Sequence, residues 1–275
     1  MLDQKRIGDT IMTTLTFTIG IIGGSGSLGS AIATALLAQT VVAPADLWIS
    51  NTSGTATPEQ AKSGITVTND NQALANACDV ILFCAPPARF DGITADAPEK
   101  LILSVMAGAN LEQLALKTRS KRIIRAMSSP AAANGSAYSP WIASPDATPA
   151  DKALTTQIFE ACGKTDEIFD EAQIDHFTAM TGPVPGFVAY FAQCMVDHAT
   201  AQGIAPDVAD RAIRQLFLAS ALTLNDDPTT PADQVRDMVD YAGTTAAGLT
   251  NMMASPLSHA ISEGLLVAAA KARTI

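Results

Sequence analysis

The most constraining feature of this 275-residue sequence is an apolar run, a glycine-rich turn and an alanine-rich run that follow one another directly. Leu15–Ile22 alternates threonine with large apolar residues, which predicts a buried strand. The turn Gly23–Gly29 comes next, and Ala31–Leu37 has the composition of a helix. A strand, a glycine turn and a helix in this order are the context in which G-x-G-x-x-G indicates dinucleotide binding.

Three glycines occupy the positions of that fingerprint. Gly24 is expected to permit the tight turn, Gly26 to let the backbone approach a pyrophosphate, and Gly29 to let the helix pack closely on the strand. Ser27 and Leu28, in the first helical turn, would present unpaired N–H groups and the positive end of the helix dipole to the phosphates. The alternative is a glycine-rich loop that binds nothing, and the predicted strand and helix on either side favour the dinucleotide.

The end of the second predicted strand, Asp46–Ser50, bears on the choice of coenzyme. An acidic residue about 20 positions beyond the glycine turn usually holds the ribose 2′-hydroxyl of NAD. Here the sequence reads Ser50-Asn51-Thr52-Ser53, which contains no acid to repel a 2′-phosphate. We therefore expect NADP(H), with NAD(H) still possible because no arginine accompanies these residues. An ordinary polar loop stays open for any one of them.

Length, composition and charge limit the other possibilities. The chain has room for about two domains, and its 48% hydrophobic and 16% charged residues are ample for a packed core. A net charge of −10 argues against nucleic acid or an anionic membrane as a partner. The four cysteines have no metal-ligand spacing, and two lie in apolar runs, as is typical of reduced thiols inside the cell.

The N-terminus carries two basic residues before the first apolar region, as a signal peptide does. That region is threaded with threonine and leads straight into the glycine turn without a cleavage site, so we interpret residues 1–14 as a short extension. No apolar run reaches the ~18–20 residues of a membrane span. These features predict a cytoplasmic protein that is not bound to a membrane.

Strands and helices alternate from residue 15 to residue 170. A cap and a first-turn proline at Thr57-Pro58-Glu59 indicate a helix start. Further strands are predicted at Ile65–Val67, Asp79–Ala85, Leu101–Val105, Arg122–Met127, Tyr138–Ala143 and, closing the sheet, Lys164–Phe169. This alternation predicts an α/β Rossmann-type domain, a doubly wound parallel sheet whose ligand lies beyond the carboxyl ends of the strands. Those ends supply Ser50, Asn51, Thr52, Cys84, Ala85 and Ala107 as cofactor-binding candidates.

Helical periodicity replaces the strand pattern from residue 171 to residue 275. The predicted helices are rich in alanine, weakly charged and apolar around much of their circumference. Helices of this kind are buried, yet about 105 residues offer little to bury them against. We therefore expect an all-α C-terminal domain that forms a homodimer or a higher homo-oligomer.

The order of these features resembles the pyrroline-5-carboxylate reductase family over nearly the whole chain. The glycine turn alone is common among reductases, but its combination with Gly-Thr-Thr near the C-terminus is more specific. The segments that carry the resemblance are 23–29, Ser50-Asn51, Val80–Pro87, Ser104–Gly108, Arg125–Met127, Phe177–Gly182 with Pro185, and Ala242–Leu249.

The resemblance implies an NAD(P)H-dependent reductase of a cyclic imine, whose interlocked helical domains place the substrate at the dimer interface. It implies that Gly243, Thr244 and Thr245 cradle the substrate carboxylate and face the imine nitrogen, and it adds Pro87 to the cofactor site. Thr245 would supply the hydrogen bond or proton at nitrogen. A helix N-cap at Gly243 is compatible with this role.

The chain departs from the family pattern mainly on the substrate side. Asp240-Tyr241-Ala242-Gly243 replaces Ser-Pro-Gly-Gly, and an ionised aspartate at 240 would repel a substrate carboxylate. Either Asp240 points away, or the true substrate is an imine without that carboxylate or with an added cation. Other departures are Pro86-Pro87 for Lys-Pro, Met127-Ser128-Ser129 for Met-Pro-Asn, and Thr181–Phe187 for Ser-Gly-Ser-Gly-Pro-Ala-Tyr.

Other functional classes stay open at this point. His176 or Tyr241 could donate the proton, although a lone helical histidine is more often structural. No metal-binding pattern and no hydrolase triad occurs in the sequence. The remaining alternatives are another NADP-dependent oxidoreductase of the same fold and a non-catalytic NADP(H)-binding sensor.

Overall fold

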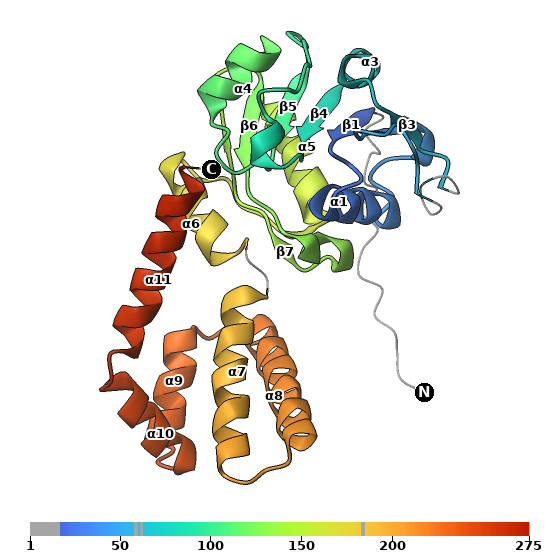
Figure 1. Cartoon of the computed structure of the whole chain (residues 1–275). Helices are drawn as coiled ribbons and strands as arrows, with labels where there is room; N and C mark the ends of the chain where they lie inside the picture. Colours follow the sequence, from blue (N-terminus) through green and yellow to red (C-terminus); the bar gives the residue numbers. More distant parts are fainter. Residues whose placement is uncertain (1–16, 58–59, 61–62, 183–184, 275) are drawn as a thin grey trace, which may run out of the picture. The chain divides into compact units, whose positions relative to one another are not determined.

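The computed structural model describes residues 17–57, 60, 63–182 and 185–274 (Figure 1). The described chain up to Ile174 forms one compact unit, and Asp175–Thr274 forms a second. The proposed N-terminal extension, the beginning of the first predicted strand and the helix start at Pro58 lie outside the described residues. The two units meet a few residues later than the change in periodicity at residue 171 predicts.

The first unit alternates strands and helices along the chain. In order, its elements are β1 (Ile19–Ile22), α1 (Ser27–Ala38), η1 (Pro44–Asp46), β2 (Leu47–Ser50), β3 (Thr66–Thr68), α3 (Asn71–Ala77), β4 (Val80–Phe83), η2 (Pro87–Arg89), β5 (Leu101–Ser104), α4 (Leu111–Thr118), β6 (Ile123–Ala126), η3 (Pro130–Asn134), β7 (Ala137–Tyr138), β8 (Trp141–Ala143), α5 (Pro149–Glu160) and β9 (Gly163–Lys164). Side-chain caps fix several helix starts as the sequence predicts, such as the capping box of Asn110 and Gln113 at α4.

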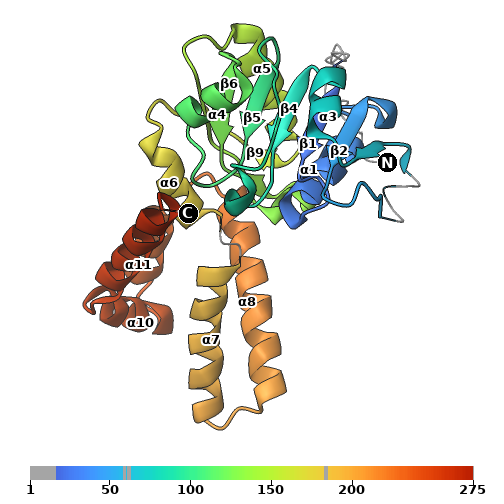
Figure 2. The same ribbon diagram turned by 45° about the horizontal axis from the view of Figure 1, so that its top comes forward.

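The main sheet has seven strands in the order β3-β2-β1-β4-β5-β6-β8, and all its pairs are parallel except β6 with β8 (Figure 2). The order 3-2-1-4-5-6 is that of the Rossmann fold, and the chain reverses direction across the sheet between β1 and β4. The predicted doubly wound parallel sheet is thus confirmed.

Alternating side chains along the strands feed two separate cores. Ile21, Leu82 and Leu103 face the core that contains α1 and α5. Ile81 and Phe83, the two neighbours of Leu82 in β4, point to the opposite face and belong to the second core with α3 and α4. The helices therefore cover both faces of the sheet, and β1, β4, β5 and β6 are buried along their whole length.

Two strand predictions at the end of the first unit are wrong. The predicted strand Tyr138–Ala143 is interrupted at Pro140, which has no N–H to donate to a ladder. Its first part, β7, pairs in parallel with β9 in a separate two-stranded sheet, and its second part, β8, takes the antiparallel edge of the main sheet.

The predicted closing strand Lys164–Phe169 is present only as the short β9 and as a single parallel bridge between Glu167 and Trp141 of β8. Gly163 approaches β7 so closely that a Cβ there would lie 2.1 Å from the carbonyl oxygen of Ala137. Phe169, at the end of the predicted strand, is 85% exposed.

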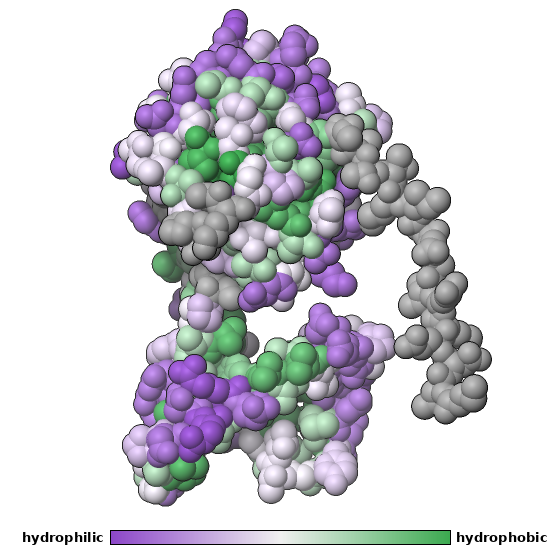
Figure 3. All heavy atoms as spheres, turned by 90° about the vertical axis from the view of Figure 1, so that its right-hand side faces the viewer, coloured by the Kyte–Doolittle hydropathy of each residue, from purple (hydrophilic) through white to green (hydrophobic). Residues whose placement is uncertain are grey.

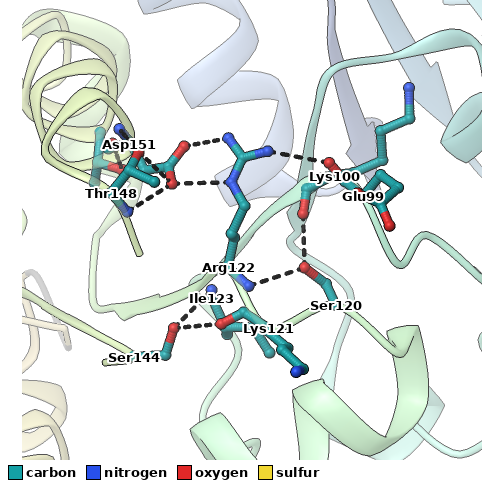
Figure 4. Close-up of polar contacts among 10 residues, drawn as sticks. Glu99, Lys100, Ser120, Lys121, Arg122, Ile123, Ser144, Thr148 and Asp151 are labelled. Carbon is teal, nitrogen blue, oxygen red and sulfur yellow. Dashed lines mark hydrogen bonds and ion pairs between the residues drawn. The ribbon is translucent and has the colours of Figure 1, made fainter. Parts of the chain in front are cut away.

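A polar network around the buried Asp151 fixes the start of α5 to the amino-terminal edge of the sheet (Figure 4). Arg122 donates to Asp151 through Nε (2.9 Å) and Nη2, and to the carbonyl of Glu99 (3.0 Å). Asp151 also forms the capping box of α5 with Thr148. Burial alone would raise the pKa of Asp151, but the hydrogen bonds from Arg122 and Thr148 outweigh it and lower that pKa below its usual value.

The second unit is entirely helical in its described part. Its elements are α6 (Ala172–Met180), which begins just before the unit, α7 (Gly186–Ala201), α8 (Pro206–Asp226), α9 (Pro231–Asp240), α10 (Thr244–Met253) and α11 (Leu257–Ala272). α7 and α8 lie side by side (Figures 1 and 2). Between them, the rings of Phe191 and Phe217 meet edge to face with their centroids 6.1 Å apart. The predicted all-α domain is confirmed.

Candidate functional site

The glycine turn between β1 and α1 leaves no room for side chains at three positions. A Cβ on Gly24 would lie 2.6 Å from the side chain of Ile49, and a Cβ on Gly29 would lie 2.5 Å from the carbonyl oxygen of Gly23. The positive φ of the turn is at Gly23 (+85°), where a Cβ would also collide with the backbone of Ala85. The left-handed residue of the turn is thus Gly23, one position before Gly24, while Gly24 and Gly29 both lie where a side chain does not fit.

The N-terminus of α1 is open to a ligand. Gly26 is the N-cap residue and offers no side chain, no capping hydrogen bond is made there, and the first turn contains no acidic residue. The N–H groups of the first turn, including those of Ser27 and Leu28, have no acceptors within a helix. This 12-residue helix thus presents unpaired donors and the positive end of its dipole, which suit a pyrophosphate.

The loop after β2 is tied to the glycine turn by Asn51. Its Nδ2 donates to the hydroxyl of Ser25 (2.7 Å) and to the carbonyl of Thr55 (3.0 Å). Its Oδ1 accepts from the N–H of Gly54 (2.6 Å) and from the hydroxyl of Ser53 (3.1 Å). An amide has two donors and two acceptor positions, so this side chain is fully used within the protein.

The same junction is joined through the backbone. The N–H groups of Gly23 and Gly24 both donate to the carbonyl of Ser50, at 3.0 and 3.2 Å. The hydroxyl of Ser50 donates to Asn71 Oδ1 (2.6 Å) and is buried, whereas Thr52 is exposed. Of the three residues predicted here, the structure leaves the Thr52 hydroxyl open to a ligand and uses Ser50 and Asn51 to build the loop.

The other predicted cofactor residues lie at the carboxyl ends of neighbouring strands. Cys84 and Ala85 follow β4, Pro87 begins η2, and Ala107 follows β5. Burial raises the pKa of the Cys84 thiol to about 12, so this group is neutral and is no nucleophile. The structure therefore gathers all the predicted cofactor residues at one edge of the sheet, beside the point where strand order reverses.

The predicted substrate residues lie together in the second unit. Asp240 ends α9, Gly243 is the N-cap of α10, and Thr244 and Thr245 form the exposed first turn of α10. The first turn of α10 carries neither a side-chain cap nor an acidic residue. Both threonine hydroxyls are accessible, and within the described chain no hydrogen bond occupies either of them.

His176 does not have the environment of a proton donor. Its Nε2 lies 3.3 Å from Nη2 of Arg273, in the last turn of the chain. A guanidinium only donates, so Nε2 is the acceptor in this contact. Arg273 also pairs with the buried Asp175 (3.4 Å), which joins α6 to the end of α11.

Sequence reasoning missed two residues of the glycine turn and one anchor at the end of the first unit. Gly23 supplies the positive φ of the turn, and the Gly23-Gly24 doublet is the sequence signal that could have identified it. Ser25 accepts the hydrogen bond from Asn51. Glu171 accepts from the N–H of Leu111 (2.8 Å) and pairs with the buried Arg125 (3.2 Å). No local pattern points to that last contact, because its partners are far apart in sequence.

The described residues contain neither a cluster of metal ligands nor a helix that could span a membrane. No three His, Cys, Asp or Glu side chains in this part of the chain come together as metal ligands. No helix of the described chain combines the length and apolar character that crossing a bilayer requires.

Two family models match the two halves of the chain. Residues 18–108 match the model for NADP oxidoreductase, coenzyme F420-dependent, and residues 171–275 match that for pyrroline-5-carboxylate reductase dimerisation. Together with the fold, these matches define the class: a Rossmann-type oxidoreductase domain followed by a helical domain of a type that forms homo-oligomers.

Similarity to individual proteins extends over nearly the full length. The chain is 28% identical to pyrroline-5-carboxylate reductase of Synechocystis sp. over 260 residues, which cover 92% of this chain and 96% of that one. The structure superposes on the Coxiella burnetii enzyme of that name with a TM-score of 0.81 at 20% identity (94% and 98% covered), and on the Plasmodium falciparum pyrroline carboxylate reductase with NADP bound with 0.77 at 21% (94% and 97%). Together, the two family models and these similarities over nearly the full length support membership of the pyrroline-5-carboxylate reductase family.

Proposed function

We propose that this chain is an NADP(H)-dependent oxidoreductase that reduces the C=N bond of a cyclic imine, either pyrroline-5-carboxylate to proline or a related imine. The observation that carries this proposal is the combination, in one chain, of an open and uncapped glycine turn with a helical domain of the pyrroline-5-carboxylate reductase type. Relatives across the full length bear the name pyrroline-5-carboxylate reductase.

The residues of the first unit fit an NADP(H) dinucleotide. Gly24, Gly26 and Gly29 keep side chains away from the pyrophosphate, and the first-turn N–H groups of α1 would bind it. The loop after β2 presents neutral hydroxyls and no carboxylate where the ribose 2′ position is expected, which favours the 2′-phosphate. When bound, the coenzyme supplies the hydride.

The residues of the second unit would hold the imine. The N–H groups at the first turn of α10 and the Thr244 hydroxyl would fix the substrate, and the Thr245 hydroxyl would form the hydrogen bond at the imine nitrogen. The protein itself has to align the two reactants and to hydrogen-bond the imine nitrogen, because the coenzyme is the reductant.

The helical domain supports a homodimer or a larger homo-oligomer. Both clusters of buried hydrophobic residues in the described chain lie in the first unit. The buried apolar side chains described for the second unit are all alanines, namely Ala179, Ala209, Ala246, Ala269 and Ala272. Large apolar side chains lie open on α7, α8, α10 and α11, and hydrophobic atoms are visible on the helical unit in the space-filling view (Figure 3). Exposed apolar area of this kind marks an interface.

We further propose the cytoplasm as the compartment. Cys78, Cys84 and Cys162 are free and buried, and burial raises the pKa of each thiol to about 12. Unpaired cysteines are usual where thiols are kept reduced.

The test of the proposed function is a panel of cyclic imines and their saturated amines, followed through nicotinamide absorbance with NADPH, NADH and their oxidised forms. Turnover of any cyclic imine with NADPH supports the proposal. Tight NADPH binding without turnover of any imine would contradict it and favour a non-catalytic sensor.

A further inference from the structure

The turn between α9 and α10 has an unusual composition for its conformation. Only Tyr241, Ala242 and Gly243 separate the last residue of α9 from the first of α10. The N–H of Ala242 donates to the carbonyl of Val239 (3.0 Å), and Ala242 itself has a φ of +56°. An alanine is strained in this left-handed region, where glycine is not. The chain therefore reverses tightly between α9 and α10, and Asp240 and Tyr241 lie within four residues of the start of α10.

Tyr241 stands beside the N-cap of α10. A Cβ placed on Gly243 would lie 3.3 Å from Cδ1 and 3.4 Å from Cε1 of the tyrosine ring, so the ring rests against the backbone of Gly243. Tyr241 is nevertheless 83% exposed. One face of an aromatic ring, with its negative quadrupole, is thus available next to the first turn of α10.

The same turn carries uncompensated negative charge. Asp237 and Asp240 occupy the last turn of α9, which contains no basic residue. Arg236, one position earlier, is paired with Asp233 at the other end of the helix. α10 contains no charged side chain at all. Two carboxylates at the negative end of a helix dipole make this turn a poor neighbour for an anion.

We propose that Asp240 and Tyr241 determine the substrate class, and that this protein reduces cyclic imines that carry no carboxylate beside the C=N bond, bound as their protonated, cationic form. This inference rests on the proposed function, which assigns the imine to Thr244 and Thr245. A substrate carboxylate about 4 Å from Asp240 would lose roughly ten- to a thousandfold in affinity, depending on the local dielectric. An iminium cation is attracted both by the carboxylate and by the face of Tyr241.

The reaction of such a substrate balances without a further reactant. A hydride from the reduced nicotinamide forms the new C–H bond at the imine carbon, and the π electron pair of C=N⁺ becomes the lone pair of nitrogen. The product is a neutral cyclic amine and the oxidised coenzyme, and the amine takes its second proton from water. The Thr245 hydroxyl accepts from the iminium N–H during this step.

The experiment measures kcat/KM with NADPH for 1-pyrroline and for pyrroline-5-carboxylate in the wild-type protein and in four variants, one of which, Tyr241→Leu, removes the aromatic ring. Asp240→Asn removes the charge and keeps the shape, and Asp240→Ser restores a donor. Asp226→Ser is the matched control, because Asp226 is the exposed last residue of α8 just as Asp240 is of α9. Circular dichroism and NADPH affinity establish that each variant is folded.

We expect the wild type to prefer 1-pyrroline. Asp240→Asn and Asp240→Ser should raise kcat/KM for pyrroline-5-carboxylate by about ten- to a thousandfold, and Asp226→Ser should change neither substrate. Tyr241→Leu should lower kcat/KM for 1-pyrroline by about two- to fivefold. A wild type that prefers pyrroline-5-carboxylate, with a ratio unchanged in Asp240→Asn, overturns the inference and leaves the proposed function intact. Absence of turnover of these two imines and of every other cyclic imine of the panel overturns the proposed function and the inference with it.

Discussion

In the first unit, four strands of the sheet are buried along their whole length, whereas α7 and α9 of the helical unit contain no buried residue in the described chain. Both halves are rich in apolar residues, so composition does not separate them. Helices on the two faces of the sheet cover the apolar side chains of its strands. The helices of the second unit have no sheet to cover, and their apolar faces need a second copy of the chain. Stability in the first unit is therefore a property of one chain, and in the second a property of the assembly.

The largest effect should come from charging the open face of the helical unit. Leu266 and Val267 are adjacent on α11 and point in directions about 100° apart, so a partner covering this helix meets one or both. Leu266→Asp/Val267→Asp should dissociate the oligomer, because an unpaired carboxylate buried at an interface costs about 3 kcal/mol or more. Light scattering measures the mass. Leu116→Asp, at a 75% exposed position of α4, is the control and should leave the mass unchanged. An oligomer that persists in the double variant would show that the exposed apolar side chains of α11 are not part of an interface, and would contradict the contrast drawn between the two units.

The next largest effect should distinguish a core of one chain from a core of two. Leu82 is fully buried in β4, and Leu82→Ala should lower the free energy of unfolding by about 2–5 kcal/mol at every protein concentration. Leu222→Ala, at a 56% exposed position of α8, should destabilise only under conditions where the oligomer forms. Denaturant unfolding at two protein concentrations makes the measurement. A concentration-dependent loss in Leu82→Ala would contradict this division.

The sequence predicted the first unit well because its signals are local. Buried strands, capping residues and the glycine fingerprint can each be recognised within a few positions, and most of the strands and the parallel sheet were predicted from them. The errors concern which strands pair with one another, because pairing depends on segments that are distant in sequence. Pro140 splits one predicted strand between two sheets, and β8 takes the edge that Lys164–Phe169 was expected to occupy.

The candidate site follows the same division. The strand ends that gather the cofactor residues follow from topology alone. The hydrogen bonds that consume Asn51 and the exchange of Gly24 for Gly23 at the turn require coordinates. In the helical unit the helices themselves were predicted, but the site residues rest on the resemblance alone, since nothing local says which face of a helix meets a partner.

A third prediction concerns the chemistry assigned to the helical unit. Thr245→Ala should lower kcat by about 30- to 1000-fold, because one hydrogen bond to the reacting nitrogen is worth about 2–4 kcal/mol in the transition state. NADPH affinity should stay the same, since the coenzyme residues belong to the first unit. Thr250→Ala is the control on the same helix, where the hydroxyl only bonds the carbonyl of Ala246. Unchanged turnover in Thr245→Ala would remove this residue from the site.

A fourth prediction contrasts a buried ion pair with exposed ones. The pKa of Asp151 is lowered in the folded state, so its contribution is present above the unfolded pKa of about 3.9 and is lost as pH falls through the lower folded pKa. Asp151→Asn should cost about 2 kcal/mol at pH 7, less than a fully buried pair because Arg122 is partly exposed. The difference from wild type should shrink below pH 4.

The control for Asp151 is Asp96→Asn, which breaks the exposed pair with Arg119 and should change stability much less than Asp151→Asn does. Urea unfolding at several pH values measures both variants. Equal losses at neutral pH in the two would show that burial adds nothing to the pair with Arg122.

The smallest effect, and the sharpest test of coenzyme choice within the first unit, is expected at Asn51. An aspartate there brings a negative charge toward the ribose 2′ position and lowers NADPH affinity by about tenfold relative to NADH. It also loses the donor to Ser25 and to the carbonyl of Thr55, so part of the loss falls on both coenzymes. Asn51→Ala removes the same contacts without adding charge, and it should weaken NADPH and NADH binding equally. The ratio of the two dissociation constants, measured by fluorescence titration, then separates the charge from the contacts. If Asn51→Asp and Asn51→Ala give the same ratio, no 2′-phosphate lies near this loop, and the preference for NADP(H) must be set elsewhere in the first unit.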